Sequence, residues 1–454
     1  MKNLPNILFV FADQWRYQAT GYAGDPNVVT PHLDRLAGES INFSAAVSGC
    51  PVCTPYRASL LTGQRPLTHG LFVNDVPLQP KGTPLGEAFA AAGYATGWIG
   101  KWHLNGNGRS HPIPKERRMG FDYWKVLECT HDYRHSLYYC GDETTPRLWP
   151  GYDATAQTED ALAWMEAAAR DPRPFFLTLS WGPPHSPYRG APPEYEALYD
   201  PERLVLPPNV PPELEEKARR WLAGYYAHCS ALDACIGALA AGLERLGMAE
   251  ETVFIFTSDH GDMLGSHGQE HKQRPWEESV RVPFLLRYPG APGWQPREVT
   301  APIDAPDIMP TLLGLCGLPV PDGVEGLDYS PVVFGGSPPG DGVALLTCPH
   351  PFGQWSAPQF GGRAYRGIRT DRHTYVRDRN GPWLLYDNGS DPFQLRNLLE
   401  APCPPAALAV LVERLDALLS ARLEATGDRF LDGAEYVREW GYPVDETGTV
   451  PYLP

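Results

Sequence analysis

Short apolar runs alternate with helical patterns over most of this chain, and that order leaves few folds open to it. Short apolar runs are typical of buried strands, and helical patterns between them connect one strand to the next in parallel order. The sequence therefore predicts an α/β fold with a mainly parallel sheet sandwiched by helices. We expect strands at residues 7–12, 95–100, 175–181, 252–258 and 282–288. We expect helices at residues 83–92, 154–170, 213–246 and 308–316.

The pattern changes near residue 340. The segment GGSPPGDG at 335–342 has the composition of a linker. Adjacent strands joined by a tight turn follow it, which is typical of a small antiparallel sheet. We therefore expect a main domain at 1–340 and a small C-terminal α+β subdomain at 341–454. In this subdomain we expect strands at 365–369, 374–379 and 383–386, a hairpin turn at Asn380-Gly381, and a helix at 405–425.

The balance of charge is strongly acidic. The 454 residues include 54 Asp and Glu against 38 Lys and Arg, which gives a formal net charge of −16. We expect no nucleic-acid partner, because phosphate binding needs a basic face. An anionic small substrate is still compatible with this charge, since a few cations can reverse the field inside a pocket.

No apolar segment has the length of a transmembrane helix. The apolar run at 7–12 is also too short for the core of a signal peptide. We therefore expect no membrane partner and a cytoplasmic protein, or a periplasmic or secreted one if a leader has been removed.

Reactive side chains follow four of the predicted strands. A single aspartate after a strand is often a helix cap or a turn residue, but here four strands coincide. Because ligands collect at the carboxyl ends of parallel strands, we expect these side chains to lie close together. Two carboxylates among them suit a hard divalent cation. The side chains are Asp13 and Gln14 after the first strand, Lys101 and His103 after the second, His185 after the third, and Asp259 and His260 after the fourth.

The segment CTPYRASLLTG at 53–63 predicts a short helix that begins at Cys53 and ends at Gly63. Arg57 would lie one turn after Cys53. A nucleophile at this helix start feels the positive helix end and the guanidinium, and both favour an oxyanion. Cys50 and Cys53 also form a C-x-x-C pair, but no second pair follows, which argues against a zinc or thioredoxin-like site.

This segment resembles the signature of the type I sulfatases, a family of the alkaline phosphatase-like superfamily. The resemblance covers most of the chain, including the C-terminal pattern at 368–392. It implies that Cys53 is oxidised to formylglycine by a formylglycine-generating or sulfatase-maturating enzyme, and that the hydrated aldehyde is the nucleophile. It implies hydrolysis of a small-molecule or sugar sulfate ester. Tyr56 departs from the family pattern, which usually has Ser there.

The resemblance also implies one divalent metal ion. The family metal is Ca²⁺, but many sulfatases have Asp in place of Gln14 and Asn in place of His260. These two replacements look like the choline-sulfatase and phosphonate monoester hydrolase branches. An imidazole ligand adds Mn²⁺ or Mg²⁺ as alternatives. The implied ligands are Asp13, Gln14, Cys53, Asp259 and His260.

The catalytic side chains implied by the resemblance are mostly cations. His185 matches the histidine on the leaving-group side, and Lys272 matches the lysine that binds the sulfate and the leaving oxygen. Lys101 and His103 face one anion if the chain between them is extended, and they favour a sulfatase, since phosphonate monoester hydrolases typically have Tyr and Thr there. The implied set is Cys53, Arg57, Lys101, His103, His185 and Lys272.

Two questions stay open at this point. The substrate is not specified, and Asn74, His131 and Arg134 are candidate substrate-binding residues near the predicted centre. The function also has alternatives. The chain could hydrolyse phosphonate or phosphate esters with the same nucleophile, or it could bind anions without turnover if Cys53 stays a thiol.

Overall fold

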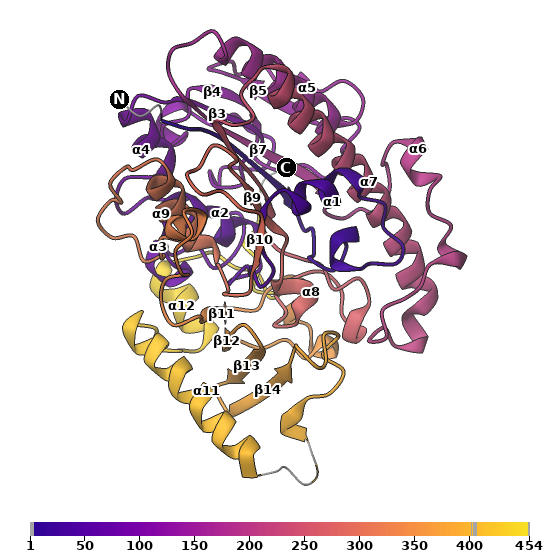
Figure 1. The fold of residues 1–454 in the computed structure, drawn as a ribbon. Coiled ribbons are helices and arrows are strands. Elements are labelled where there is room, and N and C mark those ends of the chain that lie inside the picture. Colours follow the sequence, from indigo (N-terminus) through magenta and orange to yellow (C-terminus); the bar gives the residue numbers. More distant parts are fainter. Residues whose placement is uncertain (1–3, 401, 403–405, 453–454) are drawn as a thin grey trace.

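A large mixed sheet forms the centre of the computed structural model, which describes residues 4–400, 402 and 406–452 (Figure 1). Its strands are β1 (Asn6–Asp13), β2 (Ile41–Phe43), β3 (Ala95–Lys101), β4 (Tyr123–Leu127), β5 (Leu137–Cys140), β6 (Arg147–Leu148), β7 (Phe175–Pro184), β8 (Thr252–Ser258), β9 (Phe284–Arg287) and β10 (Arg297–Val299). Within the described residues they lie in the order β10-β2-β9-β8-β1-β7-β3-β4-β5-β6. The central strands β8, β1, β7, β3 and β4 pair in parallel.

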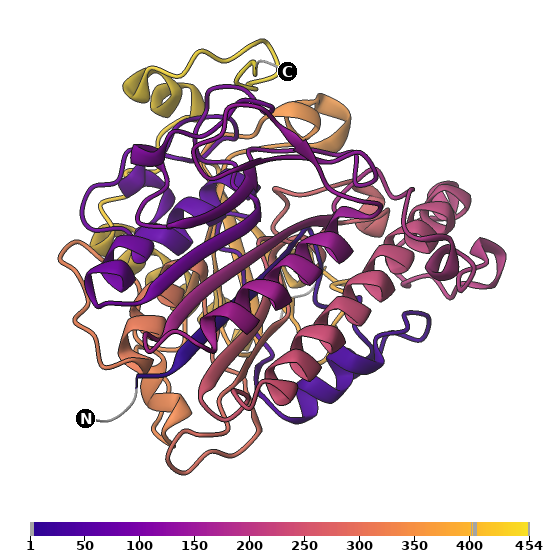
Figure 2. The same ribbon diagram turned by 90° about the horizontal axis from the view of Figure 1, so that it is seen from above.

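Helices cover both faces of this sheet (Figure 2). Successive residues of β1 point to opposite faces, so that Phe9 packs in one buried cluster and Val10 in the other. The predicted α/β fold with a helix-covered, mainly parallel sheet is confirmed. One layer contains α1 (Pro31–Gly38), α5 (Asp153–Ala168) and α7 (Glu215–Arg245), and the other contains α2 (Cys53–Thr62), α4 (Leu85–Ala91) and α9 (Ala305–Leu315). Short helices in the connections are α3 (Pro66–His69), α6 (Pro193–Glu196), α8 (Glu277–Val280) and α10 (Ser330–Val333).

A separate antiparallel sheet lies in the C-terminal part, as the sequence predicts (Figure 1). One of its faces packs on α11 (Ala406–Ala425), and Ile368 of the sheet and Leu419 of the helix belong to one buried cluster. The other face packs against Trp276 and Val280, which lie at α8. The small sheet therefore supports the loop that ends at α8. Its elements are β11 (Ala344–Cys348), β12 (Tyr365–Arg369), β13 (His373–Asp378), β14 (Gly381–Asp387) and α11 (Ala406–Ala425).

The final helix, α12 (Gly433–Trp440), packs beside the large sheet's helices. Its Tyr436 and Val437 belong to the larger buried cluster that also contains α2 and α9. The C-terminal segment therefore packs on both parts of the molecule, and the division of the chain at residue 340 stays a prediction.

Several element boundaries differ from the predicted ones. The helix expected at 308–316 begins at Ala305, because Asp304 and Asp307 form a capping box there. The strand expected at 282–288 is the shorter β9, which runs antiparallel to β8. The hairpin turn lies at residues 379–380, since Asp378 pairs with Gly381. The predicted start of the last long helix at residue 405 lies outside the described residues.

One helix, Pro212–Arg245, is long and apolar enough to cross a membrane by length and composition alone. However, 72% of its most apolar window is buried inside the fold. Its apolar residues are explained by packing against the central sheet and α5.

Candidate active site

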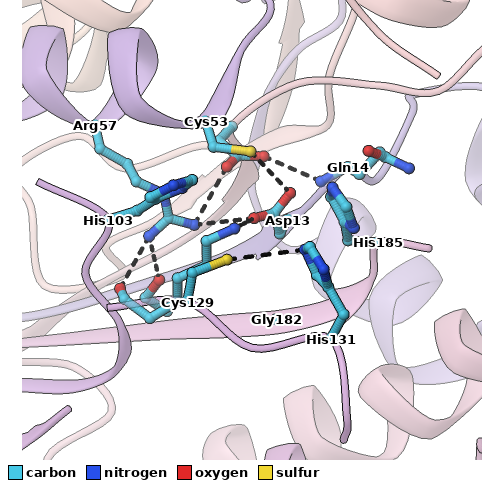
Figure 3. A network of polar contacts seen from close by, with 12 residues as sticks. Asp13, Gln14, Cys53, Arg57, His103, Cys129, His131, Gly182 and His185 are labelled. Atoms are coloured by element: carbon cyan, nitrogen blue, oxygen red, sulfur yellow. Dashed lines mark hydrogen bonds and ion pairs between the residues drawn. The ribbon is translucent and has the colours of Figure 1, made fainter. Parts of the chain in front are cut away.

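The carboxyl ends of four neighbouring strands meet at one site, as expected from their order in the sheet. β1 ends at Asp13, β3 ends at Lys101, and His185 and Asp259 directly follow β7 and β8. Figure 3 shows Asp13, Cys53, Arg57 and His185 pointing toward one another. The structure thus brings together side chains that are up to 246 residues apart in the sequence, from Asp13 to Asp259.

Helix α2 presents Cys53 to these strand ends. Cys53 is its first residue, and Gly63 ends it in a left-handed conformation with φ of 63°. The backbone N–H of Thr54 donates to Oδ1 of Asn74 at 3.1 Å, which satisfies one free donor at the helix start. Tyr56 points into the core, where its ring lies 6.3 Å from that of Phe11. The residue that departs from the family pattern therefore packs in the core.

Four buried side chains offer metal-ligand atoms that all lie within 4.8 Å of one another. The sulfur of Cys53 lies 3.6 Å from Oδ1 of Asp13 and 3.2 Å from Nε2 of His260. Burial and the neighbouring Asp13 charge raise the pKa of Asp259 to about 6. Two buried carboxylates with this repulsion fit a divalent cation between them. The four residues are Asp13, Cys53, Asp259 and His260.

Gln14 adjoins this cluster. Its backbone N–H donates to Oδ1 of Asp259 at 3.0 Å, and its Nε2 donates to Oδ2 of Asp262 at 2.5 Å. Its Oε1 accepts from Nζ of Lys272 at 3.4 Å. Because Asp262 holds the amide nitrogen, the amide oxygen faces the cluster, and its second lone pair can bind a cation. The five residues implied as ligands therefore lie together and fit a divalent cation.

Cations surround the two carboxylates and the thiol. Nη2 of Arg57 lies 3.4 Å from Asp13 and 3.2 Å from Asp259, and Nζ of Lys101 lies 2.5 Å from Asp13. Burial raises the pKa of Asp13, but the positive charges around it, that of Lys101 above all, outweigh burial and hold the pKa well below its ordinary value. For Cys53, burial and Asp13 raise the pKa of the thiol, but Lys101 and its neighbours lower it well below its ordinary value. The site thus favours a negative charge at position 53.

His103 faces the same cavity through a turn. Its φ of 60° is left-handed, so the chain from Lys101 to His103 is not extended as expected. Nε2 of His103 lies 3.2 Å from Oδ1 of Asp75, and Arg109 donates to both oxygens of that carboxylate at 2.9 and 2.8 Å. Burial lowers the pKa of His103, but the Cys129 thiolate and the Asp75 carboxylate raise it to about 9. Asp75 therefore orients His103 and stabilises its imidazolium.

Lys272 bridges the thiol and His185. Its Nζ lies 3.1 Å from the sulfur of Cys53 and 2.8 Å from Nε2 of His185. Nδ1 of His185 donates to the carbonyl of Ser186 at 2.7 Å. Burial and the Lys272 charge lower the pKa of His185 well below its ordinary value. The pKa of His185 therefore favours the neutral ring, whose Nε2 accepts a hydrogen bond from the Lys272 ammonium.

The site opens into a cavity of about 260 Å³, which we call the active-site cavity. Of the predicted substrate-binding residues, Asn74 and His131 line it, and the His131 ring stacks on that of His185 at 4.6 Å. Arg134 does not line it; instead it donates to the carbonyls of Gly190 and Ala191 at 3.0 and 2.6 Å and so holds the loop after β7. The C-terminal part contributes Phe352, Gly353, Gln354, Trp355, Thr449 and Val450 to the cavity wall.

Three residues near the centre are not among the predicted ones. Ser180 lies inside β7 and accepts from Nη1 of Arg57 at 2.8 Å, with no local sequence signal. Asp75 is adjacent to Asn74 and could have been considered with it. Cys129 follows β4, the next strand beyond β3, so the same strand-end argument could have found it. Burial raises the pKa of Cys129, but Lys101 and His103 lower it to about 5.

Comparisons with known proteins show which family the chain resembles. The family model described as "Sulfatase" matches residues 5–318, and the model "N-sulphoglucosamine sulphohydrolase, C-terminal" matches residues 265–421. The chain is 46% identical to an ulvan-active sulfatase of Formosa agariphila, over 99% of this chain and 87% of that protein. It is 33% identical to an endo-4-O-sulfatase of Bacteroides thetaiotaomicron, over 87% of this chain and 88% of that protein.

A solved structure is also similar. The fold superposes on that of a putative sulfatase from Bacteroides fragilis with a TM-score of 0.84 and 28% identity, over 96% of this chain and 98% of that one. The similarity therefore includes both the large sheet and the C-terminal sheet.

Proposed function

This chain belongs to the sulfatase family and is a sulfuric ester hydrolase, and we propose that its substrate is a sulfated sugar of a polysaccharide. The observation that carries the proposal is the pair of cations Lys101 and Lys272, which line the active-site cavity together with Cys53. Two such cations can hold a sulfate group. The sugar part rests on the relatives, which are an ulvan-active sulfatase and an endo-4-O-sulfatase by name.

We propose that Cys53 is converted to formylglycine. When present, the hydrated aldehyde supplies a nucleophile and a divalent cation supplies positive charge beside it. Since Cys53 is only 1% exposed in the folded chain, the maturating enzyme has to reach it before folding is complete. A partner that modifies the folded protein would have no access to the sulfur.

The chain's own residues then have separate tasks. Lys101 and Lys272 bind sulfate oxygens and neutralise their charge. Lys272 and His185 lie side by side where the ester oxygen departs, and together they deliver a proton to it. His103 can take a proton from the group at position 53, and Asp75 stabilises the imidazolium that results.

For the metal we propose a divalent cation bound by Asp13, Gln14, Asp259 and His260, with position 53 completing the set. Carboxylate and amide oxygens suit Ca²⁺, Mg²⁺ and Mn²⁺. Because imidazole is an uncommon ligand of Ca²⁺ and a common one of transition metals, His260 favours Mn²⁺ over the Ca²⁺ of the family.

Sulfate release from a substrate panel tests the proposal. The panel contains a sulfated polysaccharide such as ulvan, sulfated monosaccharides, choline sulfate, an aryl sulfate and a phosphonate monoester. We expect the highest kcat/KM with sulfated sugars. A higher kcat/KM with choline sulfate or with the phosphonate monoester would contradict the assignment to sugars.

A further inference from the structure

A second pocket of about 470 Å³ opens beside the active-site cavity, and we call it the side pocket. Ser186 and His271 line both cavities. The carbonyl of Ser186 accepts from Nδ1 of His185 at 2.7 Å, and His271 directly precedes Lys272. The side pocket therefore opens on the side of the centre where His185 and Lys272 face the departing oxygen.

Cations from two elements line the side pocket. Arg189 lies in the loop after β7, whereas Lys217 and Arg220 lie near the start of α7. Lys217 pairs with Glu270 at 2.8 Å, and Arg220 pairs with an exposed glutamate at 3.0 Å. Arg189 has no ion pair among the residues that the structure describes. On a chain with a net charge of −16 this local excess of cations is suited to an anionic ligand.

An aromatic surface faces the same space. Trp221 is half-buried in α7, and Nζ of Lys217 lies 4.4 Å from its ring centroid. The ring of Tyr188 meets Trp221 edge-on at 6.4 Å, and the Tyr188 hydroxyl donates to Oδ2 of Asp262 at 2.5 Å. Since Asp262 also holds Gln14, the wall of the side pocket is fixed to the centre itself. An aromatic ring with cations beside it can bind the apolar face of a sugar ring and its acidic group together.

We propose that the side pocket binds an anionic sugar residue next to the one that carries the cleaved sulfate. The enzyme then recognises its sulfate ester within an oligosaccharide chain, with one sugar in the active-site cavity and a neighbour against Trp221. This inference rests on the proposed function, because it requires a sulfated sugar at the centre. Beyond the proposed function, it specifies that the substrate is an oligosaccharide and that the neighbouring sugar is anionic.

The test compares substrates of different length. We would measure kcat/KM on an aryl sulfate, on a sulfated monosaccharide and on sulfated tetrasaccharides prepared from ulvan. The variants are Trp221→Ala, Trp221→Tyr and the double variant Arg189→Ala/Arg220→Ala. Arg245→Ala, an exposed arginine at the opposite end of α7, is the matched control.

We expect the parent to prefer the tetrasaccharide. Trp221→Ala and the double arginine variant should each lower kcat/KM on the tetrasaccharide about tenfold, mainly through KM, as expected for loss of an aromatic or arginine anchor. The same variants should keep the parent rate on the aryl sulfate and the monosaccharide. Trp221→Tyr should recover part of the loss, Arg245→Ala should show none, and added salt should weaken the preference of the parent.

Two results would overturn the inference alone: a parent that hydrolyses the monosaccharide and the tetrasaccharide equally well, or variants that lose the same factor on both. The exposed arginine variants keep the test valid if Trp221→Ala disturbs packing. A parent that cleaves the aryl sulfate but no sulfated sugar of any length would instead contradict the proposed function, and the side-pocket assignment with it.

Discussion

Nζ of Lys272 lies 2.8 Å from Nε2 of His185, and the ammonium donates to the ring. The other ring nitrogen of His185 donates to the carbonyl of Ser186 at 2.7 Å. The two side chains therefore share one proton position beside Cys53, on the side where we propose that the leaving group departs. To donate a proton without Lys272, His185 would itself have to be protonated. Burial and the neighbouring Lys272 charge lower the pKa of His185 and so disfavour the imidazolium.

This pair predicts a dependence on the leaving group. His185→Ala and Lys272→Ala should each lower kcat/KM for a sugar sulfate by about 10²–10⁴-fold, the range expected of a general acid. An aryl oxide with a low conjugate-acid pKa departs with little help, so His185→Ala should lose much less on an activated aryl sulfate. Lys272→Ala should lose less there too, but it should keep the part of its loss that is due to sulfate binding. Steady-state kinetics on both substrate types check this. Equal losses on both would mean that the pair only holds the sulfate.

The buried carboxylates predict a reversible metal requirement. A chelator should abolish activity, and Mn²⁺ should restore more of it than Ca²⁺ does, because His260 is among the ligands. Metal content should be about one ion per parent chain, because the residues that the structure describes contain one such ligand cluster. Asp13→Asn and Asp259→Asn should bind it weakly, whereas the surface variant Arg245→Ala should retain it. Full activity of a metal-free sample would contradict the assignment.

Metal binding should also be visible in stability. A cation that binds only the folded chain raises the melting temperature in proportion to the logarithm of its concentration. Asp259→Asn should remove that response, since it deletes a ligand. It should also remove a repulsive charge beside Asp13, so the metal-free variant should melt no lower than the metal-free parent. Thermal unfolding with and without added metal measures both effects.

The pair of Asp75 and His103 predicts a shift in the pH profile. His103 has to be neutral to accept a proton, so activity should rise as pH increases through the pKa of His103. Asp75 stabilises the imidazolium and thereby raises this pKa. Asp75→Asn lowers it, so the rising limb of kcat/KM should move to lower pH, while maximal kcat falls because the ring is less well oriented. If the rising limb of the pH profile stays at the same pH in Asp75→Asn, a group other than His103 controls it.

The sequence could predict the parts of the site that follow buried strands. Asp13, Lys101 and Asp259 end or follow apolar runs, and the sheet order then brings them together. The position of Cys53 at a helix start could be predicted from the segment that begins with it, and the structure forms helix α2 there. These features depend on local periodicity and on one general rule about parallel sheets.

Features that depend on distant contacts could not be predicted in this way. The charge state of His185 depends on Lys272, which is 87 residues away. Ser180 lies close to the end of β3 because β7 pairs with β3, and Nη1 of Arg57 donates to both Ser180 and the Lys101 carbonyl there. Arg134 and His131 lie in the same polar segment, but only His131 lines the active-site cavity. The side chain of Arg134 instead binds the loop after β7, which the composition of the segment does not indicate.

Sulfate release by the Cys53→Ala variant tests the central claim most directly. Both proteins would be produced together with a maturating enzyme, and a mass measurement of the peptide around residue 53 would report aldehyde or thiol in the parent. We expect formylglycine in the active parent and no turnover of any sulfate ester by Cys53→Ala, with an unchanged circular dichroism spectrum because only a small buried side chain is altered. A folded Cys53→Ala protein that releases sulfate at a rate near that of the parent would contradict the account.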